Sequence, residues 1–350
     1  MLIYDLDLPA LTKLLKEWKE PAYRAKQIWQ GLYQHFYHSP EQFTTLSKTL
    51  REKLSGIDFV GITPSLIQDS SDGQTRKTLF KLPDGHLIEA VLMRYDPDSS
   101  STKGRRTLCI STQAGCAMGC VFCATGQMGF KRHLSTGEIV AQVMYYARLL
   151  KEEDLTVTNI VLMGMGEPFH NYDNTMSAIA QLNDAEGFNF GARRFTISTV
   201  GLVPAIRRFA DEKRQVNLAV SLHAADDVSR LEMMPINKKY NIEEILQACE
   251  YYVLQTSRRV TFEWALIYGV NDTPEVAKKL ASRLRGLMCH VNAIPLNPTA
   301  GYNGEATDKQ RALIFKDTLE QAGIPCTIRM RRGIDIQAGC GQLAGEASST

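Results

Sequence analysis

The chain has 350 residues, of which 44% are hydrophobic and 22% are charged, and its formal net charge is +2. This composition supports a sizeable core in one large domain or two smaller ones, and its overall charge does not indicate a nucleic-acid-binding protein. The first residues lack the basic and apolar regions of a signal peptide, and no run of about 18 apolar residues predicts a membrane span. We therefore expect a cytoplasmic protein with no membrane partner.

The first ninety residues are predicted to form helices followed by short strands. Three segments have apolar residues at helical spacing: residues 9–18, 21–38 and 45–56. Residues 75–95 predict two strands around a Pro-Asp-Gly turn, and the polar segment 96–106 is the most linker-like part of the chain. We therefore expect an N-terminal accessory domain over residues 1–90 and a second domain over residues 91–350.

Beyond this segment, strand and helix patterns alternate over about 240 residues, which indicates a parallel β/α architecture. The apolar segments that predict strands are residues 105–112, 158–165, 194–199, 216–223, 260–267, 290–297 and 326–331. Helical patterns between them include residues 136–153, 241–255 and 273–287. Six or seven strands favour an incomplete β/α barrel over a full eight-fold barrel. The predicted fold class is therefore α/β, an incomplete barrel with a small N-terminal helical accessory domain.

Polar side chains follow four of the predicted barrel strands. In β/α barrels the chemistry takes place at the C-terminal ends of the strands. The strand pattern alone therefore predicts four residues of a pocket: Glu167, Ser198, His223 and Asn297.

Cys116, Cys120 and Cys123 form a C-x3-C-x2-C motif in the predicted loop after the first barrel strand. Thiolates bind zinc ions or iron–sulfur clusters. A structural zinc site usually has four ligands in two separated pairs, whereas these three cysteines are close together and no fourth has matching spacing. Three ligands on a four-iron cluster would leave one iron open. The alternatives are a zinc site and a set of buried structural thiols.

Two further cysteines stand outside this motif. Cys340 lies between glycines in GIDIQAGCGQL, which predicts an accessible thiol, and Cys109 lies seven residues before the first cysteine of the motif. Two thiols that converge on one cavity can form and break a disulfide during turnover. Each of them could instead be a packed thiol without a chemical role.

The three-cysteine motif, with Phe122 before its last cysteine, resembles the signature of radical S-adenosylmethionine enzymes. The resemblance implies that Cys116, Cys120 and Cys123 hold a [4Fe-4S] cluster whose open iron binds S-adenosylmethionine. It also implies further contacts with that cofactor from residues in GMGEP, in SLH and at two other positions: Gly166, Glu167, Ser198, Ser221, Leu222, His223 and Asn297.

Motifs along nearly the whole chain are similar to those of the RlmN/Cfr family of RNA methyltransferases. They occur in that family's order: YRAKQIWQGLY, IEAV, TLCIS, GCAMGCVFCATGQMGF, GMGEP, MPINKKYN, GVNDTPE, IPLNP and CGQLAGE. The GQMGFKRHL stretch resembles the RlmN branch, which methylates C2 of adenine, whereas the Cfr branch methylates C8. The resemblance implies an adenine of 23S rRNA as substrate, and tRNA as a second substrate.

The same resemblance implies roles for three residues. Cys340 would take a methyl group from a first S-adenosylmethionine, and a radical from a second would remove a hydrogen from that methyl. Cys109 would resolve the adduct with RNA and leave a Cys109–Cys340 disulfide. Glu89 matches the family's proton acceptor; its alternative is a solvated strand carboxylate. The resemblance also implies an electron donor such as flavodoxin or ferredoxin, and we expect a monomer.

Three residues depart from those common in the family, namely Val200, Ile334 and Gln337, and the last two put the fit of the Cys340 segment in question.

Local basic groups are candidates for phosphate binding: Lys131-Arg132, Arg193-Arg194, Lys238-Lys239 and Arg329 to Arg332. The last group leads into the Cys340 segment and is the best candidate. A role in RNA binding for the N-terminal helices, with Arg24, Lys26 and Trp29, is implied by the resemblance alone. The alternatives are methylation at C8 and a zinc-containing RNA-binding protein without catalysis.

Overall fold

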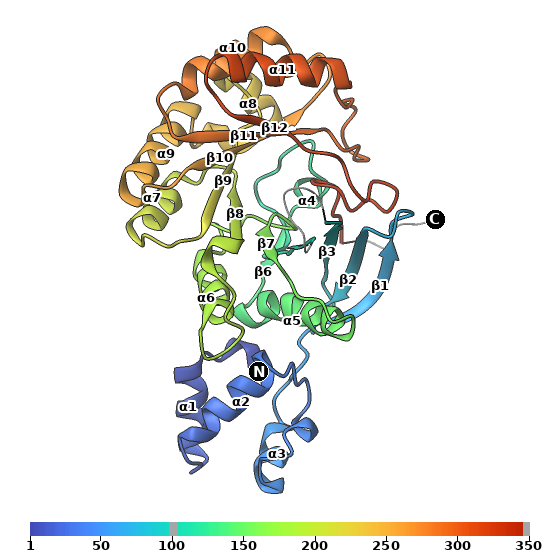
Figure 1. Ribbon diagram of the computed structural model, residues 1–350, viewed down its shortest axis with the longest axis vertical. Helices are drawn as coiled ribbons and strands as arrows, with labels where there is room; N and C mark the ends of the chain where they lie inside the picture. Colours follow the sequence, from blue (N-terminus) through green and yellow to red (C-terminus); the bar gives the residue numbers. More distant parts are fainter. Residues whose placement is uncertain (98–103, 346–350) are drawn as a thin grey trace.

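The structure, a computed structural model, describes residues 1–97 and 104–345. Of the predicted linker-like segment 96–106, residues 98–103 therefore lie outside the described part of the chain. One ten-stranded sheet runs through the molecule in the order β1-β2-β3-β4-β7-β8-β9-β10-β11-β12, and β5 and β6 form a separate pair (Figure 1). No helix of the described residues is long and apolar enough to cross a membrane.

The N-terminal helices form a layer at one end of the molecule (Figure 1). They are η1 (Ile3–Asp5), α1 (Leu8–Glu17), α2 (Tyr23–Tyr33), η2 (Pro40–Gln42) and α3 (Lys48–Leu54). Asp7 caps α1 by accepting a hydrogen bond from the Ala10 N–H (2.8 Å), which satisfies a donor that the helix leaves free. Asp5 likewise accepts from the N–H of Gly137 (2.7 Å), at the start of a barrel helix, so this layer is tied to the barrel. The three predicted helices are confirmed.

Three antiparallel strands join the N-terminal layer to the barrel: β1 (Thr63–Asp69), β2 (Thr75–Lys81) and β3 (Leu87–Tyr95). The predicted strand pair around the Pro-Asp-Gly turn is confirmed as β2 and β3. The sequence did not indicate β1, because most of this edge strand is exposed and it lacks an apolar alternation. Since β3 also pairs with β4, these strands extend the barrel sheet. The boundary at residue 90, which falls within β3, stays a prediction.

Seven parallel strands form the barrel sheet, and the predicted incomplete β/α barrel is confirmed. They are β4 (Arg105–Cys109), β7 (Asn159–Leu162), β8 (Phe195–Thr199), β9 (Asn217–Ser221), β10 (Val260–Leu266), β11 (Cys289–Pro295) and β12 (Cys326–Ile328). Because parallel strands need crossover connections, helices lie between them. These are α5 (Thr136–Glu152), α6 (Tyr172–Asn183), η3 (Ala192–Arg194), α7 (Val203–Asp211), α8 (Asp227–Met233), η4 (Pro235–Lys238), α9 (Ile242–Thr256), α10 (Pro274–Leu284) and α11 (Lys309–Gln321).

The core lies between the barrel strands and their helices. Ile160, Ile197, Val220, Phe262 and Val291 lie in five neighbouring strands and are fully buried. Burial of each such side chain stabilises the fold by roughly 1.5–3 kcal/mol. Because this packing fixes the parallel strands in register, the residues at their C-terminal ends share one edge of the sheet.

Candidate active site

The three-cysteine loop, residues 115–129, follows β4 and is held mainly by contacts within itself. It is framed by β5 (Gln113–Gly115) and β6 (Phe130–His133) and contains α4 (Ala124–Gln127). The Cys116 N–H donates to the carbonyl of Gly129 (3.0 Å), which closes the loop. Gly115 has φ +72°, and an added Cβ would lie 1.9 Å from that carbonyl oxygen. Only glycine therefore fits at the point where the two ends of the loop meet.

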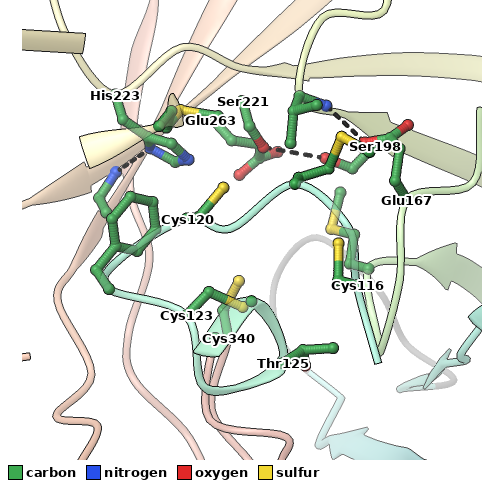
Figure 2. A pocket seen from close by; sticks show the side chains of 18 of the residues that line it. Cys116, Cys120, Cys123, Thr125, Glu167, Ser198, Ser221, His223, Glu263 and Cys340 are labelled. Atoms are coloured by element: carbon green, nitrogen blue, oxygen red, sulfur yellow. Dashed lines mark hydrogen bonds between the residues drawn. The ribbon is translucent and has the colours of Figure 1, made fainter. Parts of the chain in front are cut away.

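One cavity at the C-terminal edge of the barrel collects most of the predicted site residues, and we call it the first cavity (Figure 2). It is lined by the thiols of the motif, by strand-end residues and by the C-terminal segment: Cys116, Cys120, Cys123, Gly166, Glu167, Ser198, Ser221, His223, Asn297 and Cys340. Its space, including the part open to solvent, is about 1080 Å3. The other predicted cofactor contact, Leu222, does not line it and is fully buried.

The three thiols of the motif face this cavity from one loop (Figure 2). Burial raises the pKa of Cys116 to about 12 and that of Cys120 well above its ordinary value, so without metal both stay protonated at neutral pH. Metal ions displace such protons and bind the thiolates. Within the described residues, no group of three or more His, Cys, Asp or Glu side chains is arranged around the position of a single ion. Three soft sulfur donors on one wall of a roomy cavity fit a larger iron–sulfur cluster.

Glu167 fastens the loop after β7 to the loop after β8. Its carboxylate accepts hydrogen bonds from the N–H groups of Phe169 (3.0 Å) and Val200 (2.8 Å). Burial raises the pKa of this carboxyl to about 7. Gln113 accepts from the Glu167 N–H (2.8 Å), and Gly166, at φ +101°, leaves room for the Gln113 side chain. Val200, one of the departures from the family pattern, contributes only its backbone N–H to this contact.

His223 and Asn297 present polar atoms at the same edge. His223 Nδ1 accepts from the Ala265 N–H (2.9 Å), and burial together with Arg230 lowers the pKa of His223 to about 3. The ring is therefore neutral, with its proton on Nε2. Asn297 Nδ2 donates to the Cys340 carbonyl (3.0 Å), whereas its buried Oδ1 has no partner among the described residues. Such an acceptor suits a ligand that carries an N–H or O–H donor, because an unpaired buried polar atom costs free energy.

Sequence reasoning missed three polar residues of this site. Gln113 positions Glu167, and the buried Arg230 donates to the carbonyls of Leu222 (3.2 Å) and Val200 (2.6 Å). Glu263, from β10, lines the first cavity, accepts from the Asn292 amide (2.6 Å) and has its pKa raised to about 7 by burial. Glu263 had a signal, a carboxylate within the apolar strand VTFEWALI.

A second cavity adjoins the first and contains Cys109. Cys109 and Cys340 both line it, together with Arg329, and Cys340 lines the first cavity as well. The structure therefore brings together the two cysteines that stand outside the motif. Cys340 is exposed, as its position between glycines predicts, and Cys109 is partly exposed. Desolvation of the thiol groups within the cavity nevertheless raises the pKa of both to about 12, and nearby Arg329 lowers it slightly in each case. Both thiols are therefore protonated at neutral pH.

The Cys340 loop, residues 333–345, is held by Glu89. The Glu89 carboxylate pairs with Lys77 Nζ (3.0 Å) and accepts from the N–H groups of Ala344 (2.8 Å) and Gly345 (3.1 Å). Glu89 is 1% exposed, so it is not the solvated strand carboxylate of the alternative interpretation. It lines neither of the two cavities. Its observed contacts are those of an anchor for the loop.

The two departures in the Cys340 loop lie away from both cavities. Gln337 has φ +52°, and its N–H closes a turn with the carbonyl of Ile334 (3.0 Å). Lys77 Nζ, which pairs with Glu89, also lies 3.4 Å from the Gln337 carbonyl. The loop is therefore closed with these two residues in place.

The predicted basic groups differ in their surroundings. Arg132 pairs with Asp84 and Glu138, and Arg193 donates to Gln215 (3.4 Å). Lys238 and Lys239 are exposed on and beside η4. The group from Arg329 to Arg332 alone among them lines the second cavity.

Comparisons with known proteins agree with this geometry. A model of the radical SAM superfamily matches residues 110–281, and a model of the ribosomal RNA large subunit methyltransferase N-terminal domain matches residues 2–60. Dual-specificity RNA methyltransferase RlmN 1 of Myxococcus xanthus is 49% identical over 97% of this chain and 93% of its own length. A "Probable dual-specificity RNA methyltransferase RlmN" of Chloroflexus aurantiacus is 47% identical over 99% and 93%.

Among solved structures, a radical SAM methyltransferase from Sphaerobacter thermophilus superposes with a TM-score of 0.95. It shares 49% identity, and the match covers 99% of this chain and 100% of that one. Identity of this degree over full length confirms both the resemblance and the prediction of an enzyme. The chain belongs to the RlmN family of radical S-adenosylmethionine RNA methyltransferases.

Proposed function

We propose that this enzyme methylates C2 of an adenine in 23S rRNA and in tRNA. The names of its relatives, dual-specificity RNA methyltransferases, and the N-terminal ribosomal RNA methyltransferase model support RNA as the substrate. The observation that carries the proposal is the position of Cys340, which lines both the three-cysteine cavity and the cavity of Cys109. A carrier thiol at this point can receive a group on one side and deliver it on the other.

The family implies S-adenosylmethionine and a [4Fe-4S] cluster as cofactors. Cys116, Cys120 and Cys123 would hold the cluster. The first-cavity residues Gly166, Glu167, Ser198, Ser221, His223 and Asn297 would hold S-adenosylmethionine. Leu222, which is buried behind the cavity wall between Ser221 and His223, would support that contact. The unpaired Oδ1 of Asn297 suits the amino group of that molecule. When bound, S-adenosylmethionine and the cluster supply the methyl group and a carbon radical. A radical is needed because the aromatic C2–H carbon of adenine is a poor nucleophile for ordinary methyl transfer.

The chain's own residues would manage the carried group. The Cys340 thiol loses its proton when it takes up the methyl. After loss of a hydrogen atom to the carbon radical, the remaining methylene would bridge Cys340 and the adenine carbon, and the adduct would then give up one electron and the proton of that carbon. Cys109, as the thiolate, would attack the Cys340 sulfur and displace the bridging carbon, which takes up a proton to become the methyl group of the released RNA and leaves a Cys109–Cys340 disulfide. We retain Glu89 as the proposed proton acceptor on the strength of its match to the family's IEAV motif; it contacts the Cys340 loop through the N–H groups of Ala344 and Gly345. An external donor such as flavodoxin or ferredoxin would supply electrons to the cluster and reduce the disulfide.

Replacement of Cys109 tests this sequence of events. In Cys109→Ala the bridge between Cys340 and RNA cannot be resolved, so RNA should co-purify covalently with the protein and should resist denaturing electrophoresis. The double variant Cys109→Ala/Cys340→Ala should carry no RNA, because the attachment point is gone. Free RNA and normal turnover in Cys109→Ala would remove Cys109 from the mechanism. If the product were 8-methyladenosine, the proposed mechanism would hold, but the methylated carbon would be C8 of adenine and not C2.

A further inference from the structure

An aromatic ring with two arginines over it stands beside the second cavity. Tyr95 ends β3 and Arg105 begins β4, and the two residues are direct partners in the antiparallel pair. Arg105 Cζ lies 4.1 Å from the centroid of the Tyr95 ring. Arg332, from the segment after β12, places its Cζ 4.3 Å from the same centroid and donates to the Arg94 carbonyl (3.3 Å). Two consecutive strands and a segment more than 200 positions further along the chain thus build one platform, Tyr95 with Arg105 and Arg332.

The platform belongs to the wall of the cavity that contains both reactive thiols. Tyr95 and Arg332 line the second cavity together with Cys109 and Cys340. Arg329 and Arg331 line it too, and Met330 between them is 83% exposed. The platform therefore stands in the wall of the same cavity as Cys340.

The charge of these arginines is not neutralised by ion pairs. Within residues 1–97 and 104–345, carboxylates pair with Arg76, Arg94, Arg132, Arg208, Arg214 and Arg311. In the same part of the chain no carboxylate comes within ion-pair distance of the cavity-lining Arg329, Arg331 and Arg332, or of Arg105 on the Tyr95 ring. Asp72 and Glu263 influence Arg332 and Arg329 electrostatically without pairing with them. The positive charge around the cavity is therefore available to an anionic ligand.

We propose that the platform and Arg329 and Arg331 hold the single-stranded RNA segment that flanks the extruded adenine. Guanidinium groups bind phosphate oxygens through their N–H groups, of which each arginine has five. Arg332 and Arg331 each donate to one backbone carbonyl, of Arg94 and of Leu296, which leaves further N–H groups for a phosphate. Aromatic rings and guanidinium planes also accept unstacked bases. An anionic strand that carries flat bases is the ligand that satisfies both features. This inference rests on the proposed function, because it assumes that the adenine is delivered to Cys340.

RNA binding by the full-length, cluster-loaded protein tests the platform. The probe is a fluorescent RNA hairpin with an unpaired adenine in its loop, titrated at several salt concentrations. Arg105→Gln/Arg332→Gln should weaken binding at least about tenfold and reduce the slope of log K against log salt by about 0.7 for each arginine. Tyr95→Leu should weaken binding roughly fivefold to a hundredfold, whereas Tyr95→Phe, which keeps the ring, should bind nearly as the wild type does.

Arg207 provides a matched control. Its guanidinium also lies over a tyrosine, at 5.3 Å from the Tyr251 ring, but it belongs to α7 and lines neither cavity. In Figure 1, α7 and the C-terminal segment are on opposite sides of the molecule. Arg207→Gln should leave the dissociation constant and the salt slope unchanged. Iron content and circular dichroism of every variant separate a loss of binding from a loss of folding.

The outcomes distinguish the platform from the proposed function. Methylation of Cys340 in the absence of RNA, read from the intact mass of the protein, tests the carrier role alone. If Cys340 stays unmethylated while the double variant loses RNA, the proposed function fails and the platform stands. An unchanged dissociation constant and salt slope in the double variant would overturn the platform. In that case we would compare how fast an acidic electron-donor protein reduces the double variant and the wild type. Slower reduction of the double variant would mean that the arginines bind the electron donor.

Discussion

The three-cysteine loop and the Cys340 loop meet at the first cavity, but different kinds of contact hold them. Neighbouring residues close the first loop, as in the bond from Cys116 N–H to the Gly129 carbonyl. The second depends on partners more than 200 positions away in the sequence, which include Glu89 and Thr125. A loop closed mainly by its own residues can keep the cluster ligands together, although Val121 and Ala124 also bind distant backbone carbonyls. The Cys340 loop is anchored by residues that are distant in the sequence, such as Glu89 of β3, so its position depends on those residues.

The largest effect should come from the locally closed loop. Cys123→Ala removes one of the three proposed cluster ligands, so we expect loss of bound iron and of all detectable RNA methylation. Iron analysis and a methyl-transfer assay on anaerobically purified protein measure both. Cys289→Ala, which removes a buried thiol of β11 that lines neither cavity, should keep its iron. A fully active, iron-loaded Cys123→Ala enzyme would contradict the assignment.

The anchor of the Cys340 loop should give the next largest effect. Glu89→Gln leaves Lys77, itself 3% exposed, as a buried cation without a counter-charge, which should cost about 3–5 kcal/mol of unfolding free energy. Lys77→Met/Glu89→Gln should recover most of this loss, because the glutamine oxygen still accepts from the Ala344 and Gly345 N–H groups. Urea unfolding of the three proteins measures the difference. A loss below about 1 kcal/mol in the single variant would mean that the pair does not hold the loop.

Glu263, which lines the first cavity, should make the free energy of unfolding depend on pH. Its pKa is raised from an ordinary value of 4.5 to about 7, so between these values the folded protein binds more protons than the unfolded chain. Protonated Glu263 therefore makes its full contribution to the free energy of unfolding below about pH 4.5. This contribution, up to about 3 kcal/mol, is lost as the pH rises through 7. Glu263→Gln should therefore gain stability relative to the wild type from pH 5 to pH 8. An identical pH dependence in the two proteins would show that Glu263 titrates normally.

The smallest effect on stability concerns a side-chain link between the two loops, which are also joined by the backbone bond from the Ala124 N–H to the Gly341 carbonyl (2.8 Å). Thr125 Oγ1, in the three-cysteine loop, donates to the Leu343 carbonyl (2.6 Å). Thr125→Val keeps the shape and removes the bond, which should cost about 1 kcal/mol and speed amide hydrogen exchange in residues 341–345. Thr12→Val, which removes a similar bond to the Leu8 carbonyl in α1, should leave that exchange unchanged. Equal exchange in both variants would remove Thr125 as a link.

The contrast between the loops also explains what the sequence could predict. The alternation of strands and helices and the C-x3-C-x2-C spacing are local patterns, so the barrel, the three-cysteine loop and the strand-end positions of Glu167, Ser198 and His223 could be placed from them. The meeting of Cys109 and Cys340 was expected from family resemblance rather than from any local signal. The buried state of Glu89 could not be predicted, because it depends on Lys77 and on the return of the C-terminal segment to β3.

The most direct test of the proposed reaction uses S-adenosylmethionine with a labelled methyl group. Anaerobically purified, iron-reconstituted enzyme would receive it with a reductant and ribosomal RNA, and the RNA would then be digested to nucleosides. The proposal predicts labelled 2-methyladenosine together with released 5′-deoxyadenosine. RNA that stays unlabelled although the enzyme holds its cluster and reductant would contradict it.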